Sequence, residues 1–437
     1  MISEEHKRFI IACIGLIRLN MKGNSDLGSE DSKETPKPSS LLYGVAAATY
    51  FSDSLLLSFF FPYAVVLGVS FDQMGMMRSA RNLFQNILQI GWGEISERFG
   101  RKALIAMGYF SSGCIIAALL FCREPDQLIM LIILQSILCS AAVPSWSSLL
   151  ADYTTIKNRG KVLGRIGAVS QLSGVLATLI VALMTYKQRG EITANSFTIP
   201  FVLSAAMAIL AAVLVIFVKE VKVERPTRGW SGMTSPLLDD DFRRFLVING
   251  FYGFTMAFAW PLFPYVTIKV VHATVWQIAV ISAASGFVTS ITQPKMGSVV
   301  DRFGRKPTLI ISRTSFVLYP LLYAFASSWY HLLIINVLLS VSLSAAIVSL
   351  SAYIMDSAPP GLRANYVAST NMTMGVATFL GSIIGGIFAG KLSALFGERQ
   401  ALFMCLILAA TLRLISDICL FFIKETLPKK DAVGMSH

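Results

Sequence analysis

The sequence has little charge for its length. Only 14% of its 437 residues are Asp, Glu, Lys or Arg, whereas 54% are hydrophobic, and its mean hydropathy is +0.64. Soluble domains carry about 25% charged residues. The composition therefore excludes a string of ordinary soluble domains and indicates a chain that lies in lipid.

Residues that usually carry enzyme chemistry are also scarce. The four His lie in the expected tails and loops, and the six Cys show no paired spacing typical of disulfide or zinc frameworks. No phosphate-binding Gly-x4-Gly-Lys-Ser/Thr motif and no nucleophile–base arrangement is found. The sequence predicts neither an enzyme, nor a cofactor, nor a metal site.

Long apolar runs fill most of the chain. Runs near 20 residues span a hydrocarbon core of about 30 Å, and closely spaced spans must be helices because a barrel strand would alternate polar and apolar residues. We predict an all-α membrane protein with twelve transmembrane helices. Their expected ranges are 42–67, 73–96, 103–122, 127–150, 161–185, 197–218, 245–268, 275–297, 307–328, 331–354, 365–390 and 400–423.

The basic residues predict the orientation. With both termini in the cytoplasm, 25 of the 37 Lys and Arg fall in cytoplasmic segments and six in outer loops, as the positive-inside rule requires. The net charge of +12 then faces anionic lipid headgroups rather than nucleic acid. We expect an integral protein of the plasma (cell inner) membrane, and a monomer.

The spans group into two halves. The expected parts are a disordered cytoplasmic tail over 1–40, a six-helix bundle over 41–218, a cytoplasmic linker over 219–244, a second bundle over 245–423 and a tail over 424–437. The linker holds Pro226, Gly229, Gly232 and Pro236 among polar residues, which is typical of a connection between domains.

Two charged turns occur twice in the same register, which indicates that one bundle arose by duplication of the other. Gly93-Glu-Ile-Ser-Glu97-Arg98-Phe-Gly-Arg101-Lys recurs 204 residues later as Gly297-Ser-Val-Val-Asp301-Arg302-Phe-Gly-Arg305-Lys, and Asp152 and Arg159 recur as Asp356 and Arg363. Duplicated halves around a central site are a common transporter architecture. Glycines permit tight turns, and the acid and arginine can pair with each other or with a helix end.

These turns resemble the signature loop of the major facilitator superfamily, Gly-x-x-x-Asp-Arg-x-Gly-Arg-Lys. In the first copy Glu97 stands in place of the Asp of this motif. The resemblance covers residues 41–425. It implies two pseudo-symmetric six-helix bundles with a substrate cavity between them and alternating access by rocking. It also implies that the turn residues that match the family's pattern are gating residues rather than substrate ligands. By resemblance these are Gly93, Glu97, Arg98, Arg101, Asp152, Arg159, Gly297, Asp301, Arg302, Arg305, Asp356 and Arg363.

Drug/proton antiporters of this family usually carry an Arg in span four. Here that span carries Gln135 as its most polar early residue and no Arg. The subfamily is therefore left open.

Asp53 is the residue that most strongly indicates a function. It lies near the middle of the first span, where a carboxylate costs several kcal/mol unless it is paired, hydrated or protonated. We interpret it as a proton-coupling site, with a structural ion pair or a hydrogen bond between helices as the alternative.

A polar stripe in the second span offers a partner for Asp53. Arg81 could pair with it or bind an anionic substrate group, whereas Arg78 is expected to snorkel toward the membrane surface. Polar and aromatic residues of other spans suit a cavity for amphiphilic ligands. The cavity candidates are Arg81, Asn82, Gln85, Gln89, Gln135, Asn249, Tyr252, Trp260 and Asn371.

The sequence therefore predicts a secondary active transporter with a small-molecule substrate. The first hypothesis is proton-linked export of a drug-like or amphiphilic metabolite. The alternatives are proton-coupled uptake of a sugar or organic acid, with Arg81 as an anion ligand, and a transporter-like receptor that does not cycle.

Overall fold

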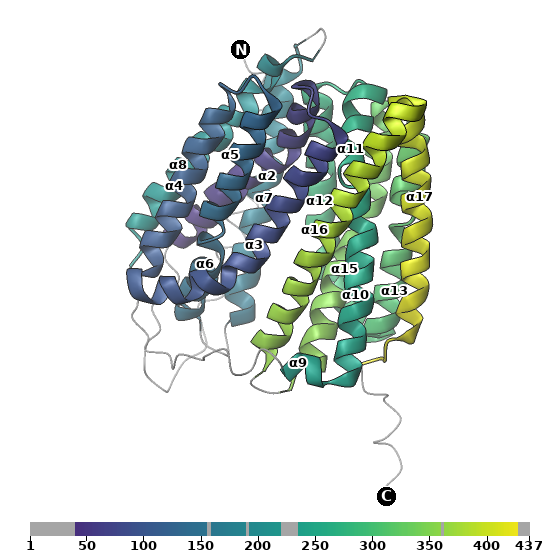
Figure 1. Ribbon diagram of the computed structural model, residues 1–437. Helices are drawn as coiled ribbons and strands as arrows, with labels where there is room; N and C mark the ends of the chain where they lie inside the picture. The colour runs from purple at the N-terminus through teal and green to yellow at the C-terminus, as the bar shows by residue number, and fades with distance from the viewer. Residues whose placement is uncertain (1–39, 155–158, 189–191, 220–234, 360–361, 427–437) are drawn as a thin grey trace, which may run out of the picture. The chain divides into compact units, whose positions relative to one another are not determined.

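The computed structural model describes residues 40–154, 159–188, 192–219, 235–359 and 362–426, and these residues form helices and connecting turns (Figure 1). The helices of the first half are α2 (Ser40–Val66), α3 (Phe71–Phe99), α4 (Arg101–Leu119), α5 (Pro125–Cys139), α6 (Ala142–Asp152), α7 (Arg159–Thr185), a 3-10 turn (Ala194–Phe197) and α8 (Thr198–Ile216). Those of the second half are α9 (Ser235–Leu238), α10 (Asp240–Phe258), α11 (Leu262–Tyr265), a π turn (Val266–Val270), α12 (Val275–Phe303), α13 (Arg305–Ser315), α14 (Leu318–Ala324), α15 (Trp329–Ser357), α16 (Arg363–Phe396), α17 (Glu398–Cys419) and a 3-10 turn (Leu420–Phe422).

The predicted fold class is confirmed, with two spans that composition alone would miss. Ten helices of the described part are long and apolar enough to cross a membrane. The other two spans do not meet that criterion. The polar stripe of α3 lowers its hydropathy, and α13 and α14 together form one span but are each too short to cross a membrane alone. The predicted tails and linker lie largely outside the described residues, so their boundaries stay a prediction.

The helix ends repeat between the halves as the sequence motifs do. Ser70 and Thr274 begin α3 and α12, and each is closed by a Gln three residues later, whose side-chain oxygen accepts the backbone N–H of the first residue at 3.0 and 2.8 Å. Such capping boxes satisfy donors that the first helical turn leaves free. Both helices end at a glycine with positive φ, Gly100 at 86° and Gly304 at 97°, a conformation that other residues rarely adopt.

Prolines break three spans. A proline has no N–H to bond the carbonyl four residues earlier. The gap between α5 and α6 lies at the carbonyl of Ser140, four residues before Pro144, and the gap between α13 and α14 lies four residues before Pro320. The end of α10 lies just before Pro261. These breaks leave carbonyls in the membrane interior that need other donors.

The two halves contact each other through symmetry-related pairs of helices. Span two (α3) packs on span eleven (α16), and span five (α7) packs on span eight (α12). Figure 1 shows α3 and α16 side by side. These are the contacts that a pseudo-two-fold relation between six-helix bundles predicts.

Glycines of α16 allow neighbouring helices to approach closely. A Cβ added at Gly381 or Gly385 would lie 2.1 Å from the backbone oxygen of Phe254 or Phe258 on α10, and one at Gly386 would lie 2.4 Å from that of Phe71 on α3. Small residues of this kind drive helix packing in membranes, where no hydrophobic force acts between helices.

Gly385→Ala should therefore destabilise the protein by about 1–3 kcal/mol, because the backbone of α10 must shift to admit the methyl group. The matched control is Gly164→Ala on α7, where an added Cβ meets nothing within 4 Å. Thermal unfolding of the purified variants measures the difference. Equal melting temperatures for the two variants would contradict the close packing of α10 on α16.

Candidate functional site

A cavity of about 530 Å³ lies against the middle of α2 and the first half of α3. Five of the residues predicted for the site line it or face it: Asp53, Arg81, Asn82, Gln85 and Trp260. The sequence analysis missed the other lining residues, which are Tyr50, Ser54, Leu57, Ser58, Phe61 and Arg78. Those from α2 recur at helical spacing around Asp53, which was the signal that could have found them.

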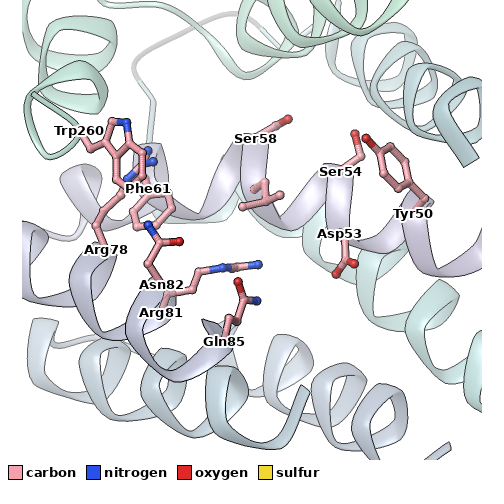
Figure 2. Close-up of a pocket in the computed structure, with 11 residues that line it drawn as sticks. Tyr50, Asp53, Ser54, Ser58, Phe61, Arg78, Arg81, Asn82, Gln85 and Trp260 are labelled. Carbon is pink, nitrogen blue, oxygen red and sulfur yellow. The ribbon is translucent and has the colours of Figure 1, made fainter. Parts of the chain in front are cut away.

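Asp53 and Arg81 face each other across this cavity. Figure 2 shows the guanidinium of Arg81 extending from α3 toward the carboxylate of Asp53 on α2. The two charges attract each other, but they form none of the ion pairs that join described residues within 4.0 Å. Arg81 is 7% exposed, and its buried Nη1 donates no hydrogen bond within the described part of the chain.

The expectation that Arg78 snorkels to the membrane surface is wrong. Its guanidinium carbon lies 3.7 Å from the centre of the Phe61 ring, and both side chains line the cavity. A cation held over an aromatic face is stabilised by about 1–2 kcal/mol when water is excluded. Phe61 lies on α2, so the contact keeps Arg78 inside the bundle instead of at its surface.

Three other polar residues predicted for the cavity are either placed elsewhere or lie outside the described part. Gln135 is buried and donates to Ser112 Oγ at 3.1 Å, within the wall of the first half. Asn371 is exposed on α16 and is not among the residues that line this cavity. Gln89 lies on α3, but its side chain is outside the described part of the structure.

Asn249 and Tyr252 form a second buried polar cluster, inside the second half. Asn249 Oδ1 accepts from Arg313 Nη2 at 2.5 Å, and the Arg313 guanidinium carbon lies 4.0 Å from the centre of the Tyr252 ring. Arg413 and Asp417 of α17 are its charged neighbours. These two predicted residues therefore contact a buried arginine and are not among the residues that line the cavity.

The repeated charged turns form matching networks. In the second half Arg305 donates to Asp356 at 2.8 Å and to Asp301 at 2.7 Å. In the first half Arg101 pairs with Asp152. Although partial burial disfavours its charge, the bonds to Asp356 and Asp301 raise the pKa of Arg305 above its ordinary value.

The lysines that follow these arginines repeat as well. Lys102 Nζ donates to the carbonyl of Ile216 at 2.6 Å, and Lys306 Nζ donates to that of Phe421 at 2.8 Å. In the second half Glu425 also accepts the backbone N–H groups of Arg305 and Lys306 at 3.1 and 3.0 Å, which caps the start of α13. Each turn thereby binds the last helix of its own half.

For the remaining residues of the charged turns, the described part of the structure gives no ion pair. Arg302 is exposed beside the ring of Phe303, and Arg363 is exposed at the start of α16. A Cβ at Gly297 would meet nothing within 4 Å, so no helix packs closely there in this conformation. The side chains of Glu97, Arg98 and Arg159 lie outside the described part, and Gly93 is placed only as part of α3.

Comparison with known proteins identifies the family. The sequence model of the Major Facilitator Superfamily matches residues 42–248 and again residues 245–434. The chain belongs to the major facilitator superfamily. The match repeats, once for each half, as the duplicated turns do.

Among individual superfamily members, the chain is similar to multidrug resistance protein 2 of Bacillus subtilis, with 23% identity over 75% of this chain and 81% of that protein. It is 22% identical to multidrug resistance protein MdtG of Proteus mirabilis over 77% of this chain and 85% of that protein. A mutant of the nucleoside transporter NupG shares its fold, with a TM-score of 0.71, 12% identity, and coverage of 87% of this chain and 98% of that one.

Members of this superfamily change conformation as they transport, which gives the second turn a testable role. Asp301→Asn should slow transport about tenfold while leaving insertion and stability intact. The side chain of Asp301 is 70% exposed, and surface ion pairs contribute at most about 1 kcal/mol to stability. Initial transport rates in proteoliposomes measure the effect.

The matched control for this prediction is Asp240→Asn, which removes an exposed ion pair with Arg243, 2.6 Å long, away from the repeated turns. It should transport at the wild-type rate. Wild-type turnover by Asp301→Asn would reduce the second turn to a topology signal.

Proposed function

We propose that this protein is a proton-linked secondary transporter that carries a small organic, amphiphilic solute by alternating access. The observation that carries the proposal is the pair of opposite charges in the cavity, Asp53 and Arg81, which face each other without forming an ion pair. A carboxylate inside a membrane bundle is costly to keep charged and unpaired. A group that gains a proton or an ionic partner in different steps of a cycle can couple proton flow to solute movement.

Contacts between the two halves support a conformation in which the transporter is closed at one end of its helices. Tyr265 of α11 donates a hydrogen bond to the carbonyl of Val69, and its ring centre lies 4.0 Å from that of Phe71. Ser79 and Ser382 add bonds between α3 and α16 at 2.9 and 3.2 Å. We place the end that carries Tyr265 outside and the charged turns in the cytoplasm, because the basic residues concentrate on the turn side.

Export is the first candidate for the direction of transport. Two relatives that cover most of the chain are named multidrug resistance proteins. The aromatic side chains of Tyr50, Phe61 and Trp260 beside the polar groups of the cavity suit an amphiphilic solute.

Proton-coupled uptake of an organic acid is the second candidate. The cavity holds two arginines and one carboxylate, and Arg81 has a buried nitrogen without a hydrogen-bond partner among the described residues. A receptor that does not cycle would have no need for matching charged networks at both turns, so we do not favour that third hypothesis.

The experiment uses purified protein in two steps. Thermal stabilisation by a library of small organic compounds of every charge first finds a ligand. The labelled ligand is then offered to proteoliposomes under an imposed proton gradient of either sign. A transporter should accumulate it under one sign only, export and uptake being distinguished by which sign drives it. Binding without gradient-driven flux would contradict the proposed function and support the receptor.

A further inference from the structure

We infer that the transported solute carries an anionic group, a carboxylate, that binds the guanidinium of Arg81, and that this anion binds together with a proton on Asp53. The inference rests on the proposed transport function and specifies its substrate class. It makes the protein a proton–anion symporter, and it therefore selects the second candidate, proton-coupled uptake, over export.

The first observation is the charge of the cavity. The lining residues Arg78 and Arg81 carry two positive charges against the single negative charge of Asp53. An excess positive charge in a poorly hydrated site is costly unless an anion neutralises it. Both arginines line the cavity, and Arg81, which is 7% exposed, has its Nη1 unbonded in the described structure. A planar guanidinium with free N–H groups matches the geometry of a carboxylate or phosphate.

The second observation is that the two arginines differ. Arg78 is held over the ring of Phe61 at 3.7 Å, so its position is fixed by a contact within the protein, although its Nε also donates no hydrogen bond among the described residues. Arg81 has no such contact and extends into the cavity (Figure 2). Arg81 is therefore the anion ligand, and Arg78 adds positive potential from a fixed position. Tyr50, Leu57 and Trp260 provide the apolar surface for the rest of the solute.

The charge of the solute determines the sign of its coupling to protons. An ionised Asp53 attracts Arg81 and repels an anion in the same cavity, whereas a protonated Asp53 does neither. By linkage, the anion then favours protonation of Asp53 by the same factor by which protonation favours the anion. A cationic solute would reverse the sign and give exchange of solute for protons.

Asp53 is the one carboxylic acid among the residues that line the cavity. The titratable groups that interact with it are Arg81 on α3, Tyr109 on α4, Cys139 on α5 and Tyr50 on its own helix. Tyrosine and cysteine ordinarily lose their protons only near pH 10 and about pH 8.5, and arginine keeps its charge. A pH dependence of binding below neutrality would therefore report on Asp53.

The test uses probes that share a body and differ in charge. Naphthalene and decyl compounds are prepared as the carboxylate, the alcohol and the ammonium salt, and binding to purified protein is measured at pH 5.5 and pH 7.5. We expect the carboxylates to bind on the order of tenfold more tightly than the alcohols and at least as much more tightly than the ammonium salts. Carboxylate affinity should rise on the order of tenfold from pH 7.5 to pH 5.5, with no such rise for the alcohols.

Three variants connect this result to the cavity. Arg81→Gln should abolish the preference for carboxylates over alcohols. Asp53→Asn should bind carboxylates tightly at both pH values, because it imitates the protonated acid. Arg123→Gln, at an exposed loop position before α5, should behave as the wild type.

Preference for the ammonium salts or the alcohols, or failure of all carboxylates to bind, would overturn the anion assignment. A carboxylate preference that survives in Arg81→Gln would overturn the role of Arg81. These results leave the proposed function intact if the ligand found without regard to charge still accumulates under a proton gradient. If the ligand does not accumulate under a proton gradient but carboxylates are still preferred, the proposed transport function is contradicted and the anion site is retained.

Discussion

Asp53→Asn should abolish gradient-driven accumulation of the solute while leaving its binding intact. The amide has the shape and polarity of the protonated acid, so it keeps the contacts of the cavity but cannot release a proton. Because Asp53 and Arg81 are not joined in an ion pair in this conformation, the loss of the carboxylate removes no hydrogen bond that the structure shows. We expect accumulation to fall by at least about 30-fold, which corresponds to about 2 kcal/mol of lost coupling, and exchange of labelled for unlabelled solute to continue.

The measurement compares proton-driven uptake with equilibrium exchange in the same proteoliposomes. Asp126→Asn, an exposed acid at the start of α5, is the control and should accumulate solute normally. A well-folded Asp53→Asn protein that accumulates solute as the wild type does would rule out the coupling role. A protein that fails to fold would support the structural alternative, in which Asp53 balances the buried charge of Arg81.

Arg413→Met should destabilise the protein more than any surface substitution. Arg413 is 2% exposed and donates to the carbonyls of Phe316 at 2.8 Å and Met256 at 2.9 Å. Phe316 lies four residues before Pro320, which has no N–H to offer it, so the only backbone donor to its carbonyl among the described residues is the N–H of Tyr319 at 3.2 Å. At the end of α10, the N–H of Trp260 bonds Ala257 at 3.0 Å, because Pro261 cannot, and this leaves the carbonyl of Met256 free.

One guanidinium therefore satisfies carbonyls at two proline breaks. At the 204-residue offset the first half carries Leu57, Ile116 and Ile209, with neither proline and no arginine. The arginine accompanies the breaks, as expected if its role is to bond the carbonyls that they expose.

Arg413→Met removes both bonds and leaves the buried carboxylate of Asp417 without a charged neighbour on its own helix. Such a change costs about 3–5 kcal/mol, and we expect a fall of about 5–10 °C in melting temperature. Arg399→Met, exposed on the same helix, should change it by less than about 2 °C. Adding Asp417→Asn to Arg413→Met should recover part of the loss. A melting temperature of Arg413→Met equal to that of Arg399→Met would contradict the account.

The fold could be predicted from the sequence because its signals are local and repeated. Apolar runs fix the spans, and the in-register turns, together with the capping boxes at Ser70 and Thr274, mark the two halves. The polar stripe of α3 hides that helix from a hydropathy criterion, yet the same stripe identifies it as a cavity wall.

The site could be predicted only in part, because a polar face does not state what it faces. Asp53, Arg81, Asn82 and Gln85 meet the cavity as expected. Asn249 and Tyr252 also form a polar face on their helix, but their side chains contact Arg313, 64 residues beyond Asn249 along the chain. Pairing of this kind depends on which helices become neighbours, and periodicity within one helix carries no such information.

The most direct test of proton-linked transport records the pH inside proteoliposomes while the solute enters. Vesicles that contain the purified protein and a pH-sensitive dye are exposed to the ligand found by thermal stabilisation, with no proton gradient at the start. Entry of an anionic solute should acidify the lumen in wild-type vesicles, because a proton accompanies each solute, and should leave its pH unchanged in Asp53→Asn vesicles. Entry of the solute into wild-type vesicles without any change in internal pH would contradict proton coupling.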